Sequence, residues 1–341
     1  MAYNLPSMTV TVRSFAKINL GLRIGAPRAD GFHELLTVYQ TIALHDVLRV
    51  TVGRGTGIEI RCADPRVPRG GSNTCFRIVE KAMQTLGVKG RVLIEIEKRL
   101  PVQGGLGGAS ANAVSALLGL ERALKKSLST AQRLRIAAEV GSDLPLFLVG
   151  GTVLGLGRGE QVYPLEDLPA HPCVVVTPEV GVSTPKAFAE WDRLWDRLCG
   201  DGHSCPSGTS TAELTVPSAS DRMVELGCAY SAWLSKCYSG APFGRGRAEN
   251  PLLELVRAGI KNDFEEVVFP EYPELCEGKR ALERAGAKYA SLSGSGSALY
   301  GLFATRQAAV KGAARLRKQG WKAEATTTLT RSQYWRQIFD C

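Results

Sequence analysis

The chain has 341 residues, of which 44% are hydrophobic and 22% are charged, as in ordinary soluble globular proteins of two domains. No apolar run approaches the roughly 18 residues that span a bilayer, which excludes an integral membrane protein. The net charge of +9 is spread along the sequence, and its densest group, Arg315, Arg317 and Lys318, fits a solvated helix face better than a nucleic-acid surface. We therefore expect neither nucleic acid nor membrane as a partner, and the basic balance suits a polyanionic small substrate.

The first residues and the cysteines bear on the cellular compartment. The segment from Met1 to Ser7 lacks the basic head and apolar run of a signal peptide, and no Arg/Ser-rich transit segment precedes the first strand. The nine cysteines include no C-x-x-C pair, so neither a zinc ribbon nor a redox motif is encoded. Several lie in apolar surroundings, where a reduced cysteine acts as a small hydrophobe. These features indicate a cytoplasmic protein.

Residues 8–24 are predicted to form a strand that carries Lys17, Asn19 and Gly21 on one face. A lysine on a half-buried strand needs an anionic partner, because an unpaired buried ammonium is costly. The alternative is an edge-strand lysine that discourages aggregation. Because Asn19 lies beside Lys17 on the same face, the pattern favours a functional site.

A turn-rich loop, with Asp30-Gly31 as its turn signal, leads to His33 and to a strand predicted over 35–44. By itself His33 fits an ordinary loop histidine. Strands are expected at about 46–52 and 57–62. A helix is predicted over 73–86, because its apolar residues recur at helical spacing and a glycine follows its end.

The stretch 101–118 follows a strand-like segment, 91–97, and combines a glycine-rich loop with an apolar helix. Glycines let backbone N–H groups approach phosphate oxygens, and the first N–H groups of the helix favour negative charge, so an anion site is predicted. Neither the Gly-Lys-Ser/Thr of a Walker A loop nor the G-x-G-x-x-G spacing of a dinucleotide fold is present. The alternative is a flexible loop that Ser110 and Asn112 cap.

A capping box, Ser129 to Gln132, opens a helix that is expected to end before Gly141. Asp143 follows among glycine, proline and apolar residues. An aspartate in this setting is either a helix cap or a functional carboxylate, and the pattern leaves both open. Residues 150–160 are predicted to form a glycine-rich hairpin.

The second half is predicted to alternate strands and helices without a long parallel series, which indicates an α+β fold. Residues 199–220 are small and polar and are expected to form a surface insertion. A second glycine turn lies between two short strands within 289–303. The other predicted elements are a strand at 173–176, helices at 184–198, around 220–237, 250–260 and 273–285, and at 306–319, and a strand at 321–328.

Three stretches, 15–24, 101–113 and 292–299, together resemble the signature motifs of the GHMP small-molecule kinases. Within that superfamily the chain is similar to the kinases that act on a cytidyl diphosphate ester of methylerythritol in the non-mevalonate isoprenoid pathway, over nearly its whole length except 199–220 and the stretch beyond. The resemblance implies an N-terminal domain over 1–165 with a left-handed βαβ crossover. It also implies a ferredoxin-like C-terminal domain over 166–341 and a cleft between the two.

The resemblance further implies transfer of the ATP γ-phosphoryl group to the C2 hydroxyl of this small acceptor. Asp143 would take the proton, Lys17 would keep that carboxylate ionised, and Asn19 would help to place the acceptor. Mg²⁺ and backbone N–H groups would neutralise the phosphates. The cytosine would be read by Phe32 and His33 and would stack on Tyr39.

The residues that the resemblance assigns to ATP lie in the glycine loop and before it. Asn73 and Lys98 would lie on the adenine side, and Ser110 is the side-chain candidate for Mg²⁺. The glycines of the third motif, Gly294 and Gly296, would let the second domain approach. The loop residues assigned to ATP are Pro101, Gly104, Gly105, Leu106, Gly107, Gly108, Ala109, Ser110 and Ala111.

This sequence departs from the usual pattern at five positions, two of which are Ser295 and Ser297 in the third motif, where threonine, alanine or proline is more familiar. Ala109 replaces a glycine, Ala111 replaces a serine, and Phe32 replaces a tyrosine, so its ring keeps a stacking face but loses a hydroxyl. A GHMP kinase for homoserine or mevalonate remains an alternative, as does a nucleotide sensor of the same fold. Because Lys17 and Asp143 are both present, the pattern argues against a sensor. We expect a monomer or a weak homodimer.

Overall fold

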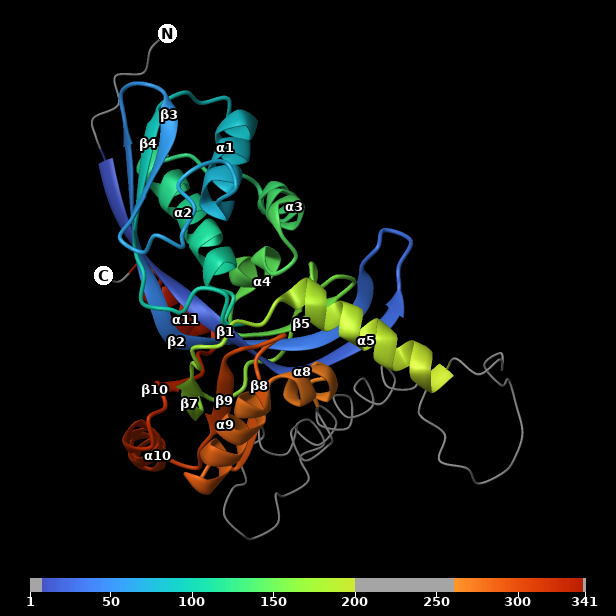
Figure 1. The fold of residues 1–341 in the computed structure, drawn as a ribbon. Coiled ribbons are helices and arrows are strands. Elements are labelled where there is room, and N and C mark those ends of the chain that lie inside the picture. Colours follow the sequence, from blue (N-terminus) through green and yellow to red (C-terminus); the bar gives the residue numbers. More distant parts are fainter. Residues whose placement is uncertain (1–7, 200–260, 340–341) are drawn as a thin grey trace, which may run out of the picture.

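The computed structural model describes residues 8–199 and 261–339 (Figure 1). The predicted insertion at 199–220, apart from Cys199, and the predicted helices around 220–237 and 250–260 lie outside these ranges. None of the described helices is long and apolar enough to cross a membrane. The described residues form two sheets with helices packed on each, which confirms the α+β, two-domain prediction.

The first sheet has six strands, and helices pack on one side of it (Figure 1). Strands β3 and β4 run parallel and are joined by helix α1, while the other strand pairs are antiparallel. The strand order is β3-β4-β2-β5-β6, with β1 paired to β2. The elements are β1 Met8–Pro27, β2 His33–Gly53, β3 Gly57–Cys62, α1 Thr74–Leu86, β4 Arg91–Glu97, α2 Gly108–Leu124, α3 Thr130–Val140, α4 Leu144–Val149, β5 Thr152–Leu156 and β6 Gln161–Pro164.

Strand β2 is longer than the sequence predicts. The strands expected at 35–44 and 46–52 are one continuous strand, because β1 pairs with it from His33 to Val52. Its second half also pairs with β4, and its first half also pairs with β5. The pairing with β1 slips twice near Lys17, between Phe15 and Lys17 and between Asn19 and Gly21. Such bulges redirect side chains locally, here on the segment that carries the predicted site.

The second sheet has four antiparallel strands in the order β10-β7-β9-β8. Numbered along the chain, this is the order 4-1-3-2 of a ferredoxin-like sheet, as predicted. Each sheet has a core cluster of its own, but Leu22 and Ile24 of β1 belong to the cluster of the second sheet, and a third buried cluster joins residues of both sheets. The elements are β7 Pro172–Val176, α5 Thr184–Cys199, α8 Glu265–Glu271, α9 Pro273–Arg284, β8 Tyr289–Leu292, β9 Leu299–Leu302, α10 Arg306–Lys318 and β10 Ala323–Thr327.

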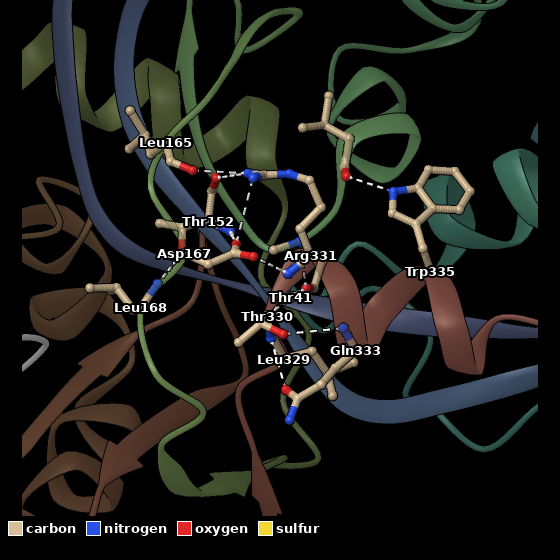
Figure 2. Close-up of polar contacts among 12 residues, drawn as sticks. Thr41, Thr152, Leu165, Asp167, Leu168, Leu329, Thr330, Arg331, Gln333 and Trp335 are labelled. Carbon is tan, nitrogen blue, oxygen red and sulfur yellow. Dashed lines mark hydrogen bonds and ion pairs between the residues drawn. The ribbon is translucent and has the colours of Figure 1, made fainter.

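The last helix, α11 Arg331–Gln337, packs in the core of the first sheet rather than on the second. Figure 2 shows how Arg331 reaches the first residue of β5 and the residue directly after β6, where its Nη2 donates to the carbonyl oxygens of Thr152 and Leu165. A domain boundary at 165/166 would assign α11 to the second domain, whereas the helix packs on the first. This helix was not predicted from the sequence, although Thr330 and Gln333 form a capping box, which marks the start of a helix.

Candidate active site

Lys17 lies buried in the middle of β1, with its side chain only 4% exposed. Its Nζ donates to Asn19 Oδ1 at 2.7 Å and lies 3.6 Å from Asp143 Oδ2. Burial lowers the Lys17 pKa below 10.5, since the charged form is desolvated, and the Asp143 carboxylate opposes that shift. A lysine buried in this way cannot act as a solvated edge-strand lysine, so the structure favours the alternative that Lys17 belongs to a site.

Asp143 lies directly before α4 and does not cap it. Its backbone is already helical, and its side chain accepts no N–H of the helix. Instead Oδ1 accepts a hydrogen bond from the Tyr39 hydroxyl at 3.2 Å, and Oδ2 faces Lys17. The side chain is 35% exposed, so the carboxylate is held from two sides and remains open to a ligand. This geometry excludes the role of helix cap for Asp143, which the sequence had left open.

The burial of Tyr39 contradicts the expectation that the cytosine stacks on its ring. The residue is 2% exposed, and its ring packs so closely on Gly155 that a Cβ there would overlap it. Burial, reinforced by the Asp143 charge, raises the Tyr39 pKa well above 10, so the hydroxyl stays protonated and donates. Tyr39 therefore presents no open ring face; it orients the carboxylate.

The glycine loop and the start of α2 line a cavity of about 370 Å³. Of the residues predicted to bind ATP, Ala111 does not line it and is 1% exposed in the core. Asn73 lines it, but its side chain already caps α1 by accepting from Cys75 N and donates to the Pro68 carbonyl oxygen. The predicted residues that line the cavity are Asn73, Lys98, Pro101, Gly104, Gly105, Leu106, Gly107, Gly108, Ala109 and Ser110.

Lys98 lines the same cavity and is paired with a carboxylate that sequence reasoning missed. Its Nζ lies 2.5 Å from Asp46 Oδ2, with side chains 9% and 0% exposed. The Asp46 carboxylate also accepts from the backbone N–H groups of Arg99 and Leu100, each at 2.7 Å. The Lys98 ammonium lies 3.2 Å from where a Cβ on Gly108 would stand, so this cation is next to the first residue of α2. The only feature of the sequence that could have indicated this role of Asp46 is that a charged residue lies within an apolar strand.

The third motif packs directly on the glycine loop. Gly105 has φ +71°, and a Cβ there would overlap the carbonyl oxygen of Ser293, so only glycine permits this contact. Ser293 Oγ donates to the Gly105 carbonyl oxygen at 3.0 Å, and Ala298 N donates to Gly104 O at 3.1 Å. The two predicted glycine segments therefore touch, one from each sheet.

Both glycine segments also reach Lys17. A Cβ on Gly107 would lie 3.0 Å from Lys17 Cγ, and one on Gly294 would lie 3.4 Å from its Nζ. Gly296 faces away from this point, toward Leu292. Lys17 N also donates to the Leu106 carbonyl oxygen at 3.0 Å. The three stretches that carry the predicted motifs thus converge on the Lys17 side chain.

The predicted base-reading residues lie at the start of β2. Phe32 is 49% exposed, and the Arg158 guanidinium lies 4.9 Å from its ring centroid. His33 is buried, with Nε2 2.7 Å from Asp192 Oδ1 and its ring stacked on Phe188 at 5.1 Å and 10°. Both partners come from α5, and no sequence signal linked that helix to His33.

The described residues contain no group of three or more His, Cys, Asp or Glu side chains that could hold a metal ion. Mg²⁺ in phosphoryl-transfer sites is commonly held by one or two carboxylates together with phosphates and water. Ser110 carries a hydroxyl and lines the cavity, and Asp143 carries a partly exposed carboxylate, so both side chains are of kinds that could hold Mg²⁺.

Comparison with known proteins identifies the family. The models for the GHMP kinases N terminal domain and the GHMP kinases C terminal match residues 73–151 and 248–322. A 4-diphosphocytidyl-2-C-methyl-D-erythritol kinase of Solibacter usitatus is 38% identical over 301 residues, which cover 87% of this chain and 82% of that protein. The chain belongs to this kinase family. A member from Moorella thermoacetica is 32% identical over 94% of this chain and 99% of its own length.

Solved structures agree with this assignment. A 4-(cytidine 5'-diphospho)-2C-methyl-D-erythritol kinase is similar at a TM-score of 0.68 and 28% identity, over 93% of this chain and 98% of that chain. A mevalonate kinase of L. major, at TM-score 0.65 and 16% identity over 96% of this chain and 98% of its own, shares the fold. The protein is therefore a GHMP small-molecule kinase.

Proposed function

We propose that this kinase transfers the γ-phosphoryl group of ATP to the C2 hydroxyl of 4-diphosphocytidyl-2-C-methyl-D-erythritol, a step of the non-mevalonate isoprenoid route. The observation that carries the proposal is the Lys17–Asp143 pair, 3.6 Å apart, at the point where both glycine segments meet. The names of the relatives support the acceptor. We also propose that the first domain comprises residues 8–165 together with α11.

ATP would lie in the cavity along the glycine loop, with its phosphates at the start of α2. There the backbone N–H groups at the helix N-terminus are unpaired within the helix and favour anions. The Lys98 ammonium, which is paired with Asp46, also lies beside Gly108 at that end of the cavity. Asn73 would contribute to the adenine side indirectly. Its side chain caps α1, so it fixes where that helix begins beside the cavity.

The acceptor hydroxyl would approach Asp143 from the solvent side. Its proton passes to an Asp143 carboxylate oxygen, the C2 oxygen bonds to the γ-phosphorus, and the bond to the β-phosphate oxygen breaks to release ADP. The Lys17 ammonium is the electrostatic partner of the carboxylate, and the Tyr39 hydroxyl fixes the orientation of the carboxylate. Asn19 holds the Lys17 ammonium, and its own amide is held by Thr37 Oγ1 at 2.8 Å.

Mg²⁺ bound to the nucleotide would neutralise phosphate charge, with Ser110 and Asp143 as the side chains able to hold it. Phe32 and His33 would contact the cytosine, since Phe32 offers an exposed ring and His33 lies beside it at the start of β2. No stacking is assigned to Tyr39.

The test is an assay of ATP consumption with four reactions run in parallel. The cytidyl methylerythritol acceptor, homoserine and mevalonate are each compared with an acceptor-free control. We expect ADP formation above the control only with the cytidyl acceptor. Turnover with homoserine or mevalonate instead would assign the chain to another GHMP activity, and nucleotide binding without turnover on any acceptor would indicate a sensor.

A further inference from the structure

His33 is held by a carboxylate from the other domain. Asp192 lies on α5, 159 residues along the chain, and its Oδ1 is 2.7 Å from His33 Nε2. Phe188, one helical turn before Asp192, covers one face of the imidazole. The His33 side chain is 8% exposed, whereas that of Asp192 is 51% exposed. Within the described part of the chain, the second ring nitrogen, Nδ1, makes no hydrogen bond.

This contact determines which ring nitrogen carries the proton. An ionised carboxylate only accepts hydrogen bonds, so Nε2 must be the donor. In the neutral imidazole the other nitrogen is then an acceptor with a free lone pair. The neutral ring therefore presents Nδ1 as an acceptor, and stacking on Phe188 limits how far the ring can turn.

We propose that Asp192 is a positioning residue that makes the kinase prefer a 4-amino pyrimidine over a 4-oxo pyrimidine. This inference rests on the proposed function, in which His33 lies against the base of the acceptor. Cytosine presents an amino group at C4, which donates to an accepting Nδ1. Uracil presents a carbonyl oxygen there, which leaves two acceptors facing each other without a proton between them, and an unmade buried hydrogen bond is costly.

Substitutions of Asp192 should change this preference without removing His33. In Asp192→Asn the amide can accept from Nε2 or donate to it, so both tautomers become accessible. In Asp192→Lys the ammonium can only donate, which forces the proton onto Nδ1 and presents a donor to the base. Glu190→Gln is the matched control, because it also removes one negative charge from α5, and Glu190 pairs with Arg193 rather than with His33.

The probes are cytidine 5'-diphosphate and uridine 5'-diphosphate, whose affinities are measured by calorimetry for the full-length enzyme and each variant. We expect the wild-type enzyme and Glu190→Gln to prefer the cytidine nucleotide by about tenfold or more, the scale of one unmade hydrogen bond. The preference should shrink in Asp192→Asn and shrink further in Asp192→Lys. The nitrogen-15 shifts of His33 report the tautomer directly and should show the proton on Nε2 only in the wild type and the control.

The two proposals fail in different ways. A preference that persists unchanged in both Asp192 variants, or a wild-type His33 with its proton on Nδ1, would overturn the role of Asp192 and leave the kinase assignment standing. A wild-type enzyme that does not distinguish the two nucleotides although its proton lies on Nε2 would show that His33 does not read the base. That result would overturn both the inference and the base-recognition part of the proposed function.

Discussion

At the scale of single residues, the proposed chemistry depends on how one carboxylate is held. Asp143 accepts from the Tyr39 hydroxyl on one oxygen and faces the Lys17 ammonium with the other. Both partners are buried, whereas Asp143 is 35% exposed, so the reactive group is the one that a substrate can reach. A positioned base of this kind accelerates proton transfer because its geometry is fixed before the substrate arrives.

Asp143→Asn keeps the shape of this side chain and removes its basicity. We expect kcat to fall by about two orders of magnitude or more, the usual scale for a positioned base, with ATP affinity little changed. Initial rates and ATP titration of the variant measure the two effects separately. A variant with near-normal turnover would contradict the assigned role.

Lys17→Met tests whether the buried charge serves activity rather than stability. Burial lowers the Lys17 pKa, so the folded protein binds this proton less tightly than the unfolded chain does. At pH values below the pKa of Lys17 in the folded protein, the charge therefore lowers the free energy of unfolding. This destabilisation disappears as the pH rises toward 10.5. We expect Lys17→Met to be as stable as wild type or about 1 kcal/mol more stable near neutral pH, and to be inactive.

Urea unfolding of the two proteins at neutral and at alkaline pH measures this difference. The stability of wild type relative to Lys17→Met should rise with pH. A variant that is markedly less stable at neutral pH would show instead that the ammonium is a net stabiliser of the fold.

At the scale of elements, Asp46 fixes the connection between β2, β4 and the glycine loop. Its carboxylate has no exposed surface and accepts from Lys98 and from two backbone N–H groups just after β4. These contacts set where the chain leaves the sheet and enters the nucleotide cavity. Strand β2 thus carries both the residue that orients Asp143 and the one that anchors the loop.

Asp46→Ala should lower the free energy of unfolding by about 3 kcal/mol or more, because it leaves the Lys98 charge buried and unpaired. The double variant Asp46→Ala with Lys98→Met should recover part of this loss, because both charges are then absent. Chemical denaturation of the single and double variants measures the coupling. Losses that simply add would mean that the pair does not interact in the folded protein.

Local patterns allowed some of these features to be predicted, and long-range contacts limited the rest. The alternation of side chains along a strand predicted that Lys17 and Asn19 lie on the same face. The glycine-rich stretch predicted an anion site where the structure has a cavity. The role of Tyr39 was predicted wrongly, because burial depends on Gly155 and on strand β5, which pairs with β2 only in the folded protein. Asp192 could not be linked to His33 from the sequence, since 159 residues separate them.

At the scale of the whole molecule, the site is assembled where the two domains meet. The first domain supplies Lys17, Asp143 and the glycine loop, and the second supplies the turn that contains Gly294. The turn is held by Asn262, whose Nδ2 donates to the carbonyl oxygens of Leu292 and Gly294. Arg23 of β1 pairs with the adjacent Asp263 at 2.8 Å, so the same segment also ties the second domain to the first.

Gly105→Ala tests this contact between domains. The added Cβ would overlap the Ser293 carbonyl oxygen and would sit at a φ that favours glycine, so the two glycine segments must separate. We expect kcat/KM to fall by about 10²-fold, the scale of a misplacement of about 1 Å in a reacting site. Gly70→Ala is the control, because nothing lies within 4 Å of a Cβ there. Equal rates in the two variants would contradict a precise fit between the domains.

The most direct measurement is phosphorus NMR of the products formed from ATP and the cytidyl methylerythritol acceptor. The account predicts one new phosphomonoester, attached at the C2 oxygen of the acceptor, formed in equal amount with ADP by the wild-type enzyme and strongly reduced in Asp143→Asn. ATP loss that yields only inorganic phosphate, or a phosphoryl group attached elsewhere on the acceptor, would contradict it.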